Sequence, residues 1–174
     1  MTEGPKRGIL APIMNRFFQY LIIVTAALVS GSFAKDTDKA DKAPSGYFTM
    51  DEMDKAQAKA KASKKLIAVL VKGSNDNCPH CVAAMSNGQS ALRGDCVMVF
   101  TRAGSVMEKA SSLSGAAKSG LSGCPDGAAV TFVVFDPELQ EVVAKLGRDE
   151  LETDRKAVGE MKKTVAASKK KLFP

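Results

Sequence analysis

The sequence predicts an α/β protein, because short apolar runs alternate along the chain with segments of helical periodicity. Three of these runs have the length of strands: Leu66–Val71, Cys96–Thr101 and Val130–Phe135. Runs of this kind are typical of strands that are buried on both faces of a sheet. A fourth run, Val142–Leu146, follows the third after only a tight turn, so these two strands are expected to form an antiparallel hairpin.

The composition excludes several classes of function. The 174 residues include 25 basic and 19 acidic side chains, for a formal net charge of +6. The lysines are interleaved with acidic residues and alanines, which is typical of solvated helix faces and not of a nucleic-acid-binding surface. A single histidine cannot supply a multi-histidine metal site. We therefore expect no nucleic-acid partner, no metal and no other cofactor.

Residues 1–34 have the features of a secretory signal peptide. Basic residues precede the short apolar run Phe17–Val29, and Ser32-Phe33-Ala34 places small residues at −3 and −1 of a cut after Ala34. The alternative is an uncleaved membrane anchor, because the charge-free stretch 17–34 reaches the lower length limit of a spanning helix. Cleavage predicts a periplasmic or secreted protein, in a compartment where disulfides persist.

The rest of the chain divides into a tether and one domain. Residues 35–46, KDTDKADKAPSG, are polar and aperiodic, which predicts a flexible tether before a domain over residues 47–174. The run Thr49-Met50-Asp51-Glu52 has the pattern of a capping box, in which Thr49 and Glu52 bond to each other's backbone N–H groups. It predicts a helix that continues to about Lys64.

Three later segments have helical periodicity. A helix that begins at Cys78 and ends near Leu92, before Gly94, would place on one side Val82, Met85, Gln89 and Leu92. A second helix would bury one face made of Val106, Ala110, Leu113 and Ala117. The last helix carries Leu151, Val158, Met161 and Val165, and its lysine-rich end suits the negative pole of the helix dipole.

The motif Cys78-Pro79-His80-Cys81 lies between the first buried strand and the helix that follows it. Two cysteines three residues apart on one helical turn can form a short disulfide. Cys78 would lie at or near the N-cap, where the helix dipole lowers the pKa of its thiol. Pro79 suits the first helical turn, and a protonated His80 would add a charge that stabilises the thiolate. The alternatives are a permanent structural disulfide and a metal site that three such residues could begin but not complete.

The order of elements around this motif resembles the thioredoxin-like superfamily over about Tyr47 to Lys171. The resemblance is carried by CPHC after a buried strand and by TFVVFDPELQEVVAKLG, which is similar to the final hairpin of that family. It implies a three-layer sandwich, with a mixed sheet of four or five strands and helices on both faces. The Pro-His pair resembles that of strongly oxidising periplasmic disulfide oxidoreductases, which implies Cys78 as the nucleophile and Cys81 as the buried resolving thiol.

Two positions near the motif depart from the family pattern. Asn77 stands where the family usually has an aromatic residue. Lys72 stands six residues before the nucleophile, where the family often has a buried acid that assists proton transfer. Asp76 is the candidate replacement for that acid.

The substrate-docking loop of the family also differs here. The family has a cis-proline before the Thr-Phe of the third strand, whereas Val130 precedes Thr131 in this chain. A cis bond before valine would cost about 3 kcal/mol, so we expect a trans bond. Pro125 lies five residues earlier and would need a bulged loop to replace the missing proline.

Cys96 and Cys124 are the remaining cysteines. A disulfide between them would stabilise the fold by about 3–4 kcal/mol on the chain-entropy model. Against closure, Cys96 begins its strand at the end far from the CPHC motif, whereas Cys124 precedes the returning strand near the motif. Cys124 would then be a third thiol of the active site, and Cys96 a small buried apolar residue.

These observations lead to two hypotheses of function. The first is an extracytoplasmic thiol–disulfide oxidoreductase that exchanges disulfides with protein thiols through a mixed disulfide on Cys78 and is served by a redox partner protein. The second is a non-catalytic thioredoxin-like binding module in which CPHC forms a structural disulfide. In either case a membrane is involved only if residues 1–34 remain attached.

We expect residues 1–34 to be absent from the exported protein, because the apolar run is short and Ala34 is followed by a charged tether. The intact mass of the exported protein measures the cleavage position. A mass that still includes Phe17–Val29 would show a retained anchor.

Overall fold

The computed structural model describes residues 42–174. The predicted signal peptide, residues 1–34, and residues 35–41 of the predicted tether lie outside the described residues. Within 42–174, no helix is both long enough and apolar enough to span a bilayer.

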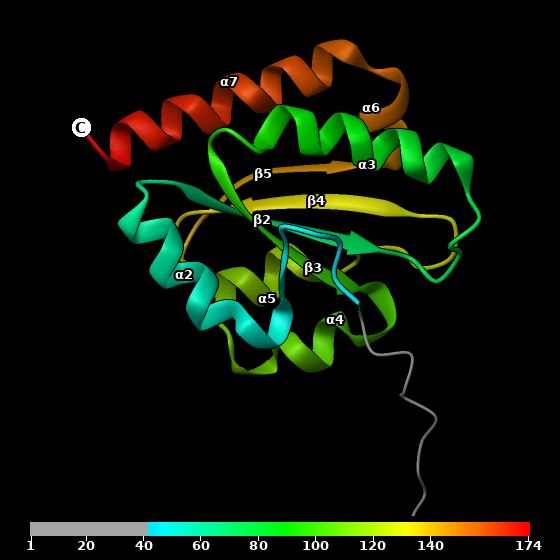
Figure 1. The fold of residues 1–174 in the computed structure, drawn as a ribbon, viewed down its shortest axis with the longest axis horizontal. Coiled ribbons are helices and arrows are strands. Elements are labelled where there is room, and N and C mark those ends of the chain that lie inside the picture. Colours follow the sequence, from blue (N-terminus) through cyan, green and yellow to red (C-terminus); the bar gives the residue numbers. More distant parts are fainter. Residues whose placement is uncertain (1–41) are drawn as a thin grey trace, which may run out of the picture. The chain divides into compact units, whose positions relative to one another are not determined.

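The centre of the domain is a five-stranded mixed sheet with the strand order β1-β3-β2-β4-β5 (Figure 1). Strands β1, β3 and β2 are parallel, β4 is antiparallel to β2, and β5 is antiparallel to β4. The strand bounds are β1 Phe48–Thr49, β2 Leu66–Lys72, β3 Cys96–Arg102, β4 Val130–Phe135 and β5 Val142–Gly147. The predicted mixed sheet and the closing antiparallel hairpin are therefore confirmed, and β1 is an additional edge strand.

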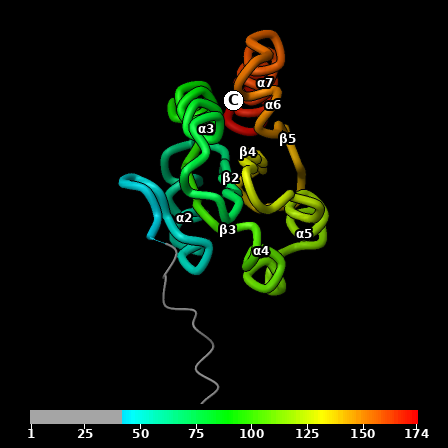
Figure 2. The backbone as a smooth tube through the Cα atoms, turned by 90° about the vertical axis from the view of Figure 1, so that its right-hand side faces the viewer, coloured from blue at the N-terminus to red at the C-terminus, as the bar shows by residue number. Residues whose placement is uncertain are grey.

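Helices cover both faces of this sheet, as Figures 1 and 2 show. One face carries α3 Pro79–Leu92, α6 Arg148–Thr153 and α7 Arg155–Leu172. The other carries α2 Met53–Ala62, α4 Ala103–Lys109 and α5 Gly115–Leu121, with short 3-10 turns at Met50–Glu52 and Ala110–Ser112. This is the three-layer α/β arrangement that the thioredoxin-like resemblance implies.

Strand β2 separates the two cores of the domain. Successive side chains of a strand point to opposite faces, so Ile67, Val69 and Val71 enter the core under α2, α4 and α5. Leu66, Ala68 and Leu70 enter the core under α3 and α7. Residues 66–71 are buried throughout, as their continuous apolar pattern predicts.

The predicted start of α2 is present, with one 3-10 turn before the helix proper. The Glu52 carboxylate accepts hydrogen bonds from the Thr49 backbone N–H at 3.2 Å and the Thr49 hydroxyl at 3.3 Å. The helix ends at Ala62, and Lys64 adopts a left-handed conformation with φ of 51° just beyond it.

The buried face of α3 differs from the one expected from the sequence. The helix buries Cys81, Ala84, Gly88 and Leu92. Of the four residues expected on the buried side, Leu92 is buried and Met85 and Gln89 are half-buried, whereas Val82 is 61% exposed. The reason is close packing: a Cβ on Gly88 would lie 2.4 Å from the Phe132 ring of β4, so the small residues face the sheet.

Two segments expected to form single helices are each divided by an N-cap residue. The segment from Val106 to Ala117 breaks before Ser114, whose hydroxyl oxygen accepts the Ala117 N–H at 3.1 Å and starts α5. The last segment breaks at Asp154, whose carboxylate accepts the Lys156 and Ala157 N–H groups at 2.9 Å each. In both cases a local side-chain cap interrupts the helix while the apolar residues on either side stay at the core.

We expect Gly88→Ala to destabilise the protein by about 1–3 kcal/mol, because the added methyl group would overlap the Phe132 ring. Urea-induced unfolding measures the change in free energy. Gly159→Ala is the matched control, since a Cβ on this glycine of α7 meets no atom within 4 Å and should leave stability unchanged or raise it by up to about 1 kcal/mol. Equal stability of the two variants would contradict the tight contact between α3 and β4.

Candidate active site

The CPHC motif forms the first turn of α3 at the end of the β2–α3 loop. Cys78 is the N-cap residue, with extended φ and ψ of −86° and 109°, and Pro79 is the first helical residue. The backbone N–H of Cys81 donates a hydrogen bond to Cys78 Sγ at 3.2 Å. Cys78 and Cys81 are only 7% and 2% exposed, and all four cysteines of the chain are free thiols in this structure.

The two thiols of the motif have opposite pKa shifts. The hydrogen bond from the Cys81 side chain is the largest cause that lowers the pKa of Cys78, and the backbone N–H groups of Cys81 and His80 add to it. Burial, together with the hydrogen bond and charge of Cys78, raises the pKa of Cys81 to about 11. The Cys78 thiol therefore ionises more readily than the Cys81 thiol.

The His80 side chain, which is predicted to stabilise the Cys78 thiolate when protonated, contacts an acidic residue of α6. Its Nδ1 pairs with the Glu152 carboxylate of α6, and the side chain is 67% exposed. His80 supports the Cys78 thiolate through its backbone N–H. His80 is the second residue of α3, and its side chain extends toward α6.

Arg148, a residue that the sequence analysis did not identify, supplies positive charge beside the thiols. Its Nη1 donates to the Ala128 carbonyl oxygen at 2.7 Å, and its Nε and Nη2 contact Asp149 Oδ1 at 2.9 and 2.8 Å. Ala128 packs against the core that contains Cys78 and Cys81, and the charge of Arg148 lowers the pKa of both thiols. The register that sets Thr131 opposite Gly147 brings Arg148 here, so its position in the sequence carries little signal.

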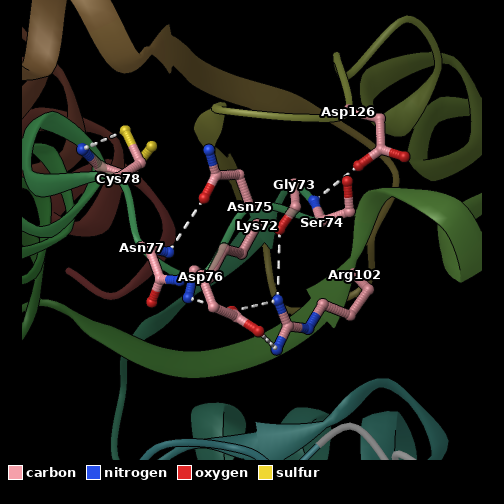
Figure 3. Close-up of polar contacts among 10 residues, drawn as sticks. Lys72, Gly73, Ser74, Asn75, Asp76, Asn77, Cys78, Arg102 and Asp126 are labelled. Carbon is pink, nitrogen blue, oxygen red and sulfur yellow. Dashed lines mark hydrogen bonds and ion pairs between the residues drawn. The ribbon is translucent and has the colours of Figure 1, made fainter.

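The loop before Cys78, residues 73–77, is held by the segment that precedes β4. Gly73 and Asn75 donate backbone N–H groups to the carbonyls of Ala129 and Gly127 at 2.9 and 3.0 Å. The Ser74 N–H donates to Asp126 Oδ1 at 2.7 Å, as Figure 3 shows. Only glycine fits at position 73, because a Cβ there would lie 2.2 Å from the Gly127 carbonyl oxygen.

Asp76 forms ion pairs with two cations. It does not replace the proton-accepting acid that the thioredoxin-like family often has at the position of Lys72. Lys72 Nζ lies 2.6 Å from Asp76 Oδ1, and Arg102 contacts both carboxylate oxygens at 2.7 and 3.2 Å. The hydrogen bonds from Arg102 and then Lys72 hold the pKa of Asp76 far below its usual value. An acid that remains ionised in this way cannot take a proton from Cys81 near neutral pH.

The three residues predicted for substrate docking lie in different environments. Val130 is fully buried in the core that contains Cys78 and Cys81, and it pairs with Lys72 in the β2–β4 ladder. No cis peptide bond occurs among residues 42–174, so the bond before Val130 is trans, as expected. The Thr131 side chain points to the other face of the sheet from Val130, toward the core under α2, α4 and α5. Pro125 lines an open cavity of about 300 Å³ that also includes Ala128 and Arg148.

A disulfide between Cys96 and Cys124, one of the two alternatives for these cysteines, does not fit this fold. Along β2, Cys96 lies opposite Leu66 and Thr131 opposite Val71, a separation of roughly 16 Å at the usual rise of a strand. The Cys124 thiol forms a hydrogen bond with the Thr131 side chain. Cys124 packs against the core on one face of the sheet, whereas Cys96 belongs to the core on the other face. A disulfide requires Cα atoms within about 7 Å, so the two cannot pair.

Nor does Cys124 join the CPHC motif as a third active-site thiol, because the sheet separates them. Burial raises the pKa of Cys96 to about 12 and also raises the pKa of Cys124. Cys96 therefore fits the description of a small buried apolar residue.

No protein-family model matches the sequence, and no curated protein matches it. A solved structure to which the chain is similar is that of a disulphide isomerase from Xylella fastidiosa Temecula1. The two are 17% identical, with a TM-score of 0.42, and the match covers 74% of this chain and 94% of that one.

We expect iodoacetamide to alkylate Cys78 first when the reduced protein is treated at mildly acidic pH. The lowered pKa of Cys78 gives it a larger thiolate fraction than Cys81 and Cys96, whose pKa values of about 11 and 12 keep them protonated. Labelling at each cysteine is followed by peptide mass spectrometry, with Cys78→Ser as the control. Faster labelling of Cys96 or Cys124 would show that the site has been assigned to the wrong residues.

Proposed function

We propose that this protein is an extracytoplasmic thiol–disulfide oxidoreductase that acts on protein substrates through Cys78 and Cys81. The observation that carries the proposal is the contrast between two thiols on one helical turn. Cys78 is a helix N-cap with a lowered pKa, and Cys81 is buried with a raised one. The predicted signal peptide, residues 1–34, supports the extracytoplasmic location.

The reaction follows from this asymmetry. The Cys78 thiolate attacks one sulfur of a substrate disulfide, a bond forms between Cys78 and the substrate, and the other substrate sulfur leaves as a thiolate. Cys81 then attacks Cys78 Sγ, and its proton goes to the substrate sulfur that leaves. The Cys78–Cys81 disulfide forms, the substrate is released, and two electrons have passed to it. The reverse steps oxidise a substrate dithiol, and a redox partner protein with a dithiol or a disulfide restores the starting state.

The surface around the motif suits exchange with polypeptides. Val82, at the first turn of α3, is 61% exposed beside the buried Cys81. The open cavity lined by Pro125 and Arg148 adjoins Ala128, which packs on the core of the two thiols. The extended, trans backbone at Val130 differs from the docking segment of the thioredoxin-like family, so turnover of protein substrates is expected to be slower than that of small disulfides.

Insulin reduction and glutathione-disulfide exchange test the proposal with matched variants. We expect Cys78→Ser to abolish both activities, because it removes the attacking sulfur. Cys81→Ser should instead accumulate a mixed disulfide that is visible as an added substrate mass. Cys96→Ala, which changes a thiol in the same core but outside the motif, should retain activity.

The opposite outcome is equally specific. A folded wild-type protein that turns over neither substrate, with Cys78 and Cys81 joined in a disulfide that resists reduction, would support the non-catalytic binding module. Equal activity of the wild-type and Cys78→Ser proteins would place the chemistry elsewhere.

A further inference from the structure

The loop before Cys78, residues 73–77, is held by hydrogen bonds and ion pairs on two sides. Its first half is held by the backbone bonds of Gly73, Ser74 and Asn75 to the segment before β4. Its second half is held through Asp76, two residues before Cys78. Arg102, the last residue of β3, contacts both oxygens of the Asp76 carboxylate and also donates to the Gly73 carbonyl oxygen at 3.2 Å (Figure 3).

Lys72 is the second cation that forms an ion pair with the Asp76 carboxylate. The Lys72 side chain is only 16% exposed, and its ammonium group lies 2.6 Å from Asp76 Oδ1. A charged side chain with so little exposure is stabilised by a partner of opposite charge. Asp76 therefore bridges the end of β2 and the end of β3, and the fork of the Arg102 guanidinium fixes its orientation.

The geometry of Cys78 depends on where this loop ends. Its sulfur accepts the Cys81 N–H at 3.2 Å only while Cys78 stays at the N-cap with an extended backbone. The Asn77 N–H bonds to the Asn75 side chain at 3.0 Å, so the turn between Asp76 and Cys78 is itself ordered. A shift of the loop at Asp76 would therefore also shift the Cys78 sulfur.

We propose that Asp76, clamped by Arg102 and Lys72, is a positioning residue that fixes Cys78 at the N-cap of α3 and thereby makes its thiol reactive. The proposal deepens the disulfide-exchange function and rests on it. Asp76 touches neither sulfur in this role. It acts through the backbone of the loop.

A through-space electrostatic effect of Asp76 would have the opposite sign. Removal of a negative charge near the motif, which leaves Lys72 and Arg102 uncompensated, favours a thiolate and lowers the pKa of Cys78. Loss of position takes the sulfur away from the helix N–H groups and raises the pKa of Cys78. The direction of the shift therefore separates the two explanations.

The test uses the full chain with Asp76→Asn and Arg102→Lys, which change the clamp with little change in size. The rate of iodoacetamide alkylation of Cys78 is measured against pH, with peptide-resolved mass spectrometry. We expect the pKa of Cys78 to rise in both variants by about one unit, so that alkylation below the pKa slows roughly tenfold. Glu160→Gln, which breaks an exposed pair with Lys163 on α7, is the control and should leave the pKa unchanged.

Hydrogen exchange provides a second measurement that does not depend on the thiols. Backbone amides of residues 73–78 should exchange faster in Asp76→Asn, while those of β2 and β4 remain protected, which also shows that the variant is folded. An unchanged or lowered pKa of Cys78 in Asp76→Asn, or unchanged exchange in the loop, would overturn the proposal.

Failure of the positioning role and failure of the proposed function are distinguishable. Alkylation and hydrogen exchange require no turnover, so a wild-type protein without disulfide exchange refutes the function and leaves these measurements intact. A wild-type protein that exchanges disulfides, with an Asp76→Asn variant that keeps the pKa of Cys78, refutes the positioning role alone.

Discussion

The hydrogen bond from the Cys81 backbone N–H to Cys78 Sγ is the contact on which the rest of the site depends. It exists because Cys78 caps α3 and because Pro79, which has no N–H of its own, begins the helix. The same turn buries Cys81, so one helical start produces both the stabilised sulfur and the shielded one. The packing of α3 on the sheet, with Gly88 against Phe132, keeps that turn in place.

The site lies where separate parts of the sheet meet. The carboxyl ends of the parallel strands β2 and β3 point the same way, and the antiparallel β4 begins at that edge. The β2–α3 loop is therefore reached from one side by Arg102 and from the other by Asp126 (Figure 3). Loops at the carboxyl edge of parallel strands are common places for binding sites, because the strands provide a rigid base for them.

Charged groups around the motif are mostly paired with one another. Asp76 binds Lys72 and Arg102, His80 pairs with Glu152, and the Arg148 guanidinium contacts Asp149. Positive charge still acts on the two thiols, from Arg148 on both and from Lys72 on Cys81. The pKa of Cys78 is consequently lowered by the Cys81 side chain, the helix-end N–H groups and the charge of Arg148 together.

Features of this protein that depend on residues close together in the chain were predictable from the sequence. Continuous apolar runs gave rise to strands β2, β3 and β4, the Asp136–Pro137 turn led to the closing hairpin, and the CPHC motif started a helix after a buried strand. These outcomes follow from local patterns of apolar side chains, turns and caps. The three-layer α/β fold was predictable for the same reason, since the order of elements leaves few arrangements of the sheet.

Contacts between residues from distant parts of the chain became visible only in the folded protein. The rotation of α3 depends on how closely Gly88 approaches Phe132, so periodicity alone selected Val82 for the buried face. The separation of Cys96 from Cys124, the approach of Arg148 and the clamp on Asp76 depend on strand register and on which face of the sheet each side chain occupies. The physical reason is that a local pattern specifies how a segment folds, whereas contacts between segments are set by the fit of their side chains.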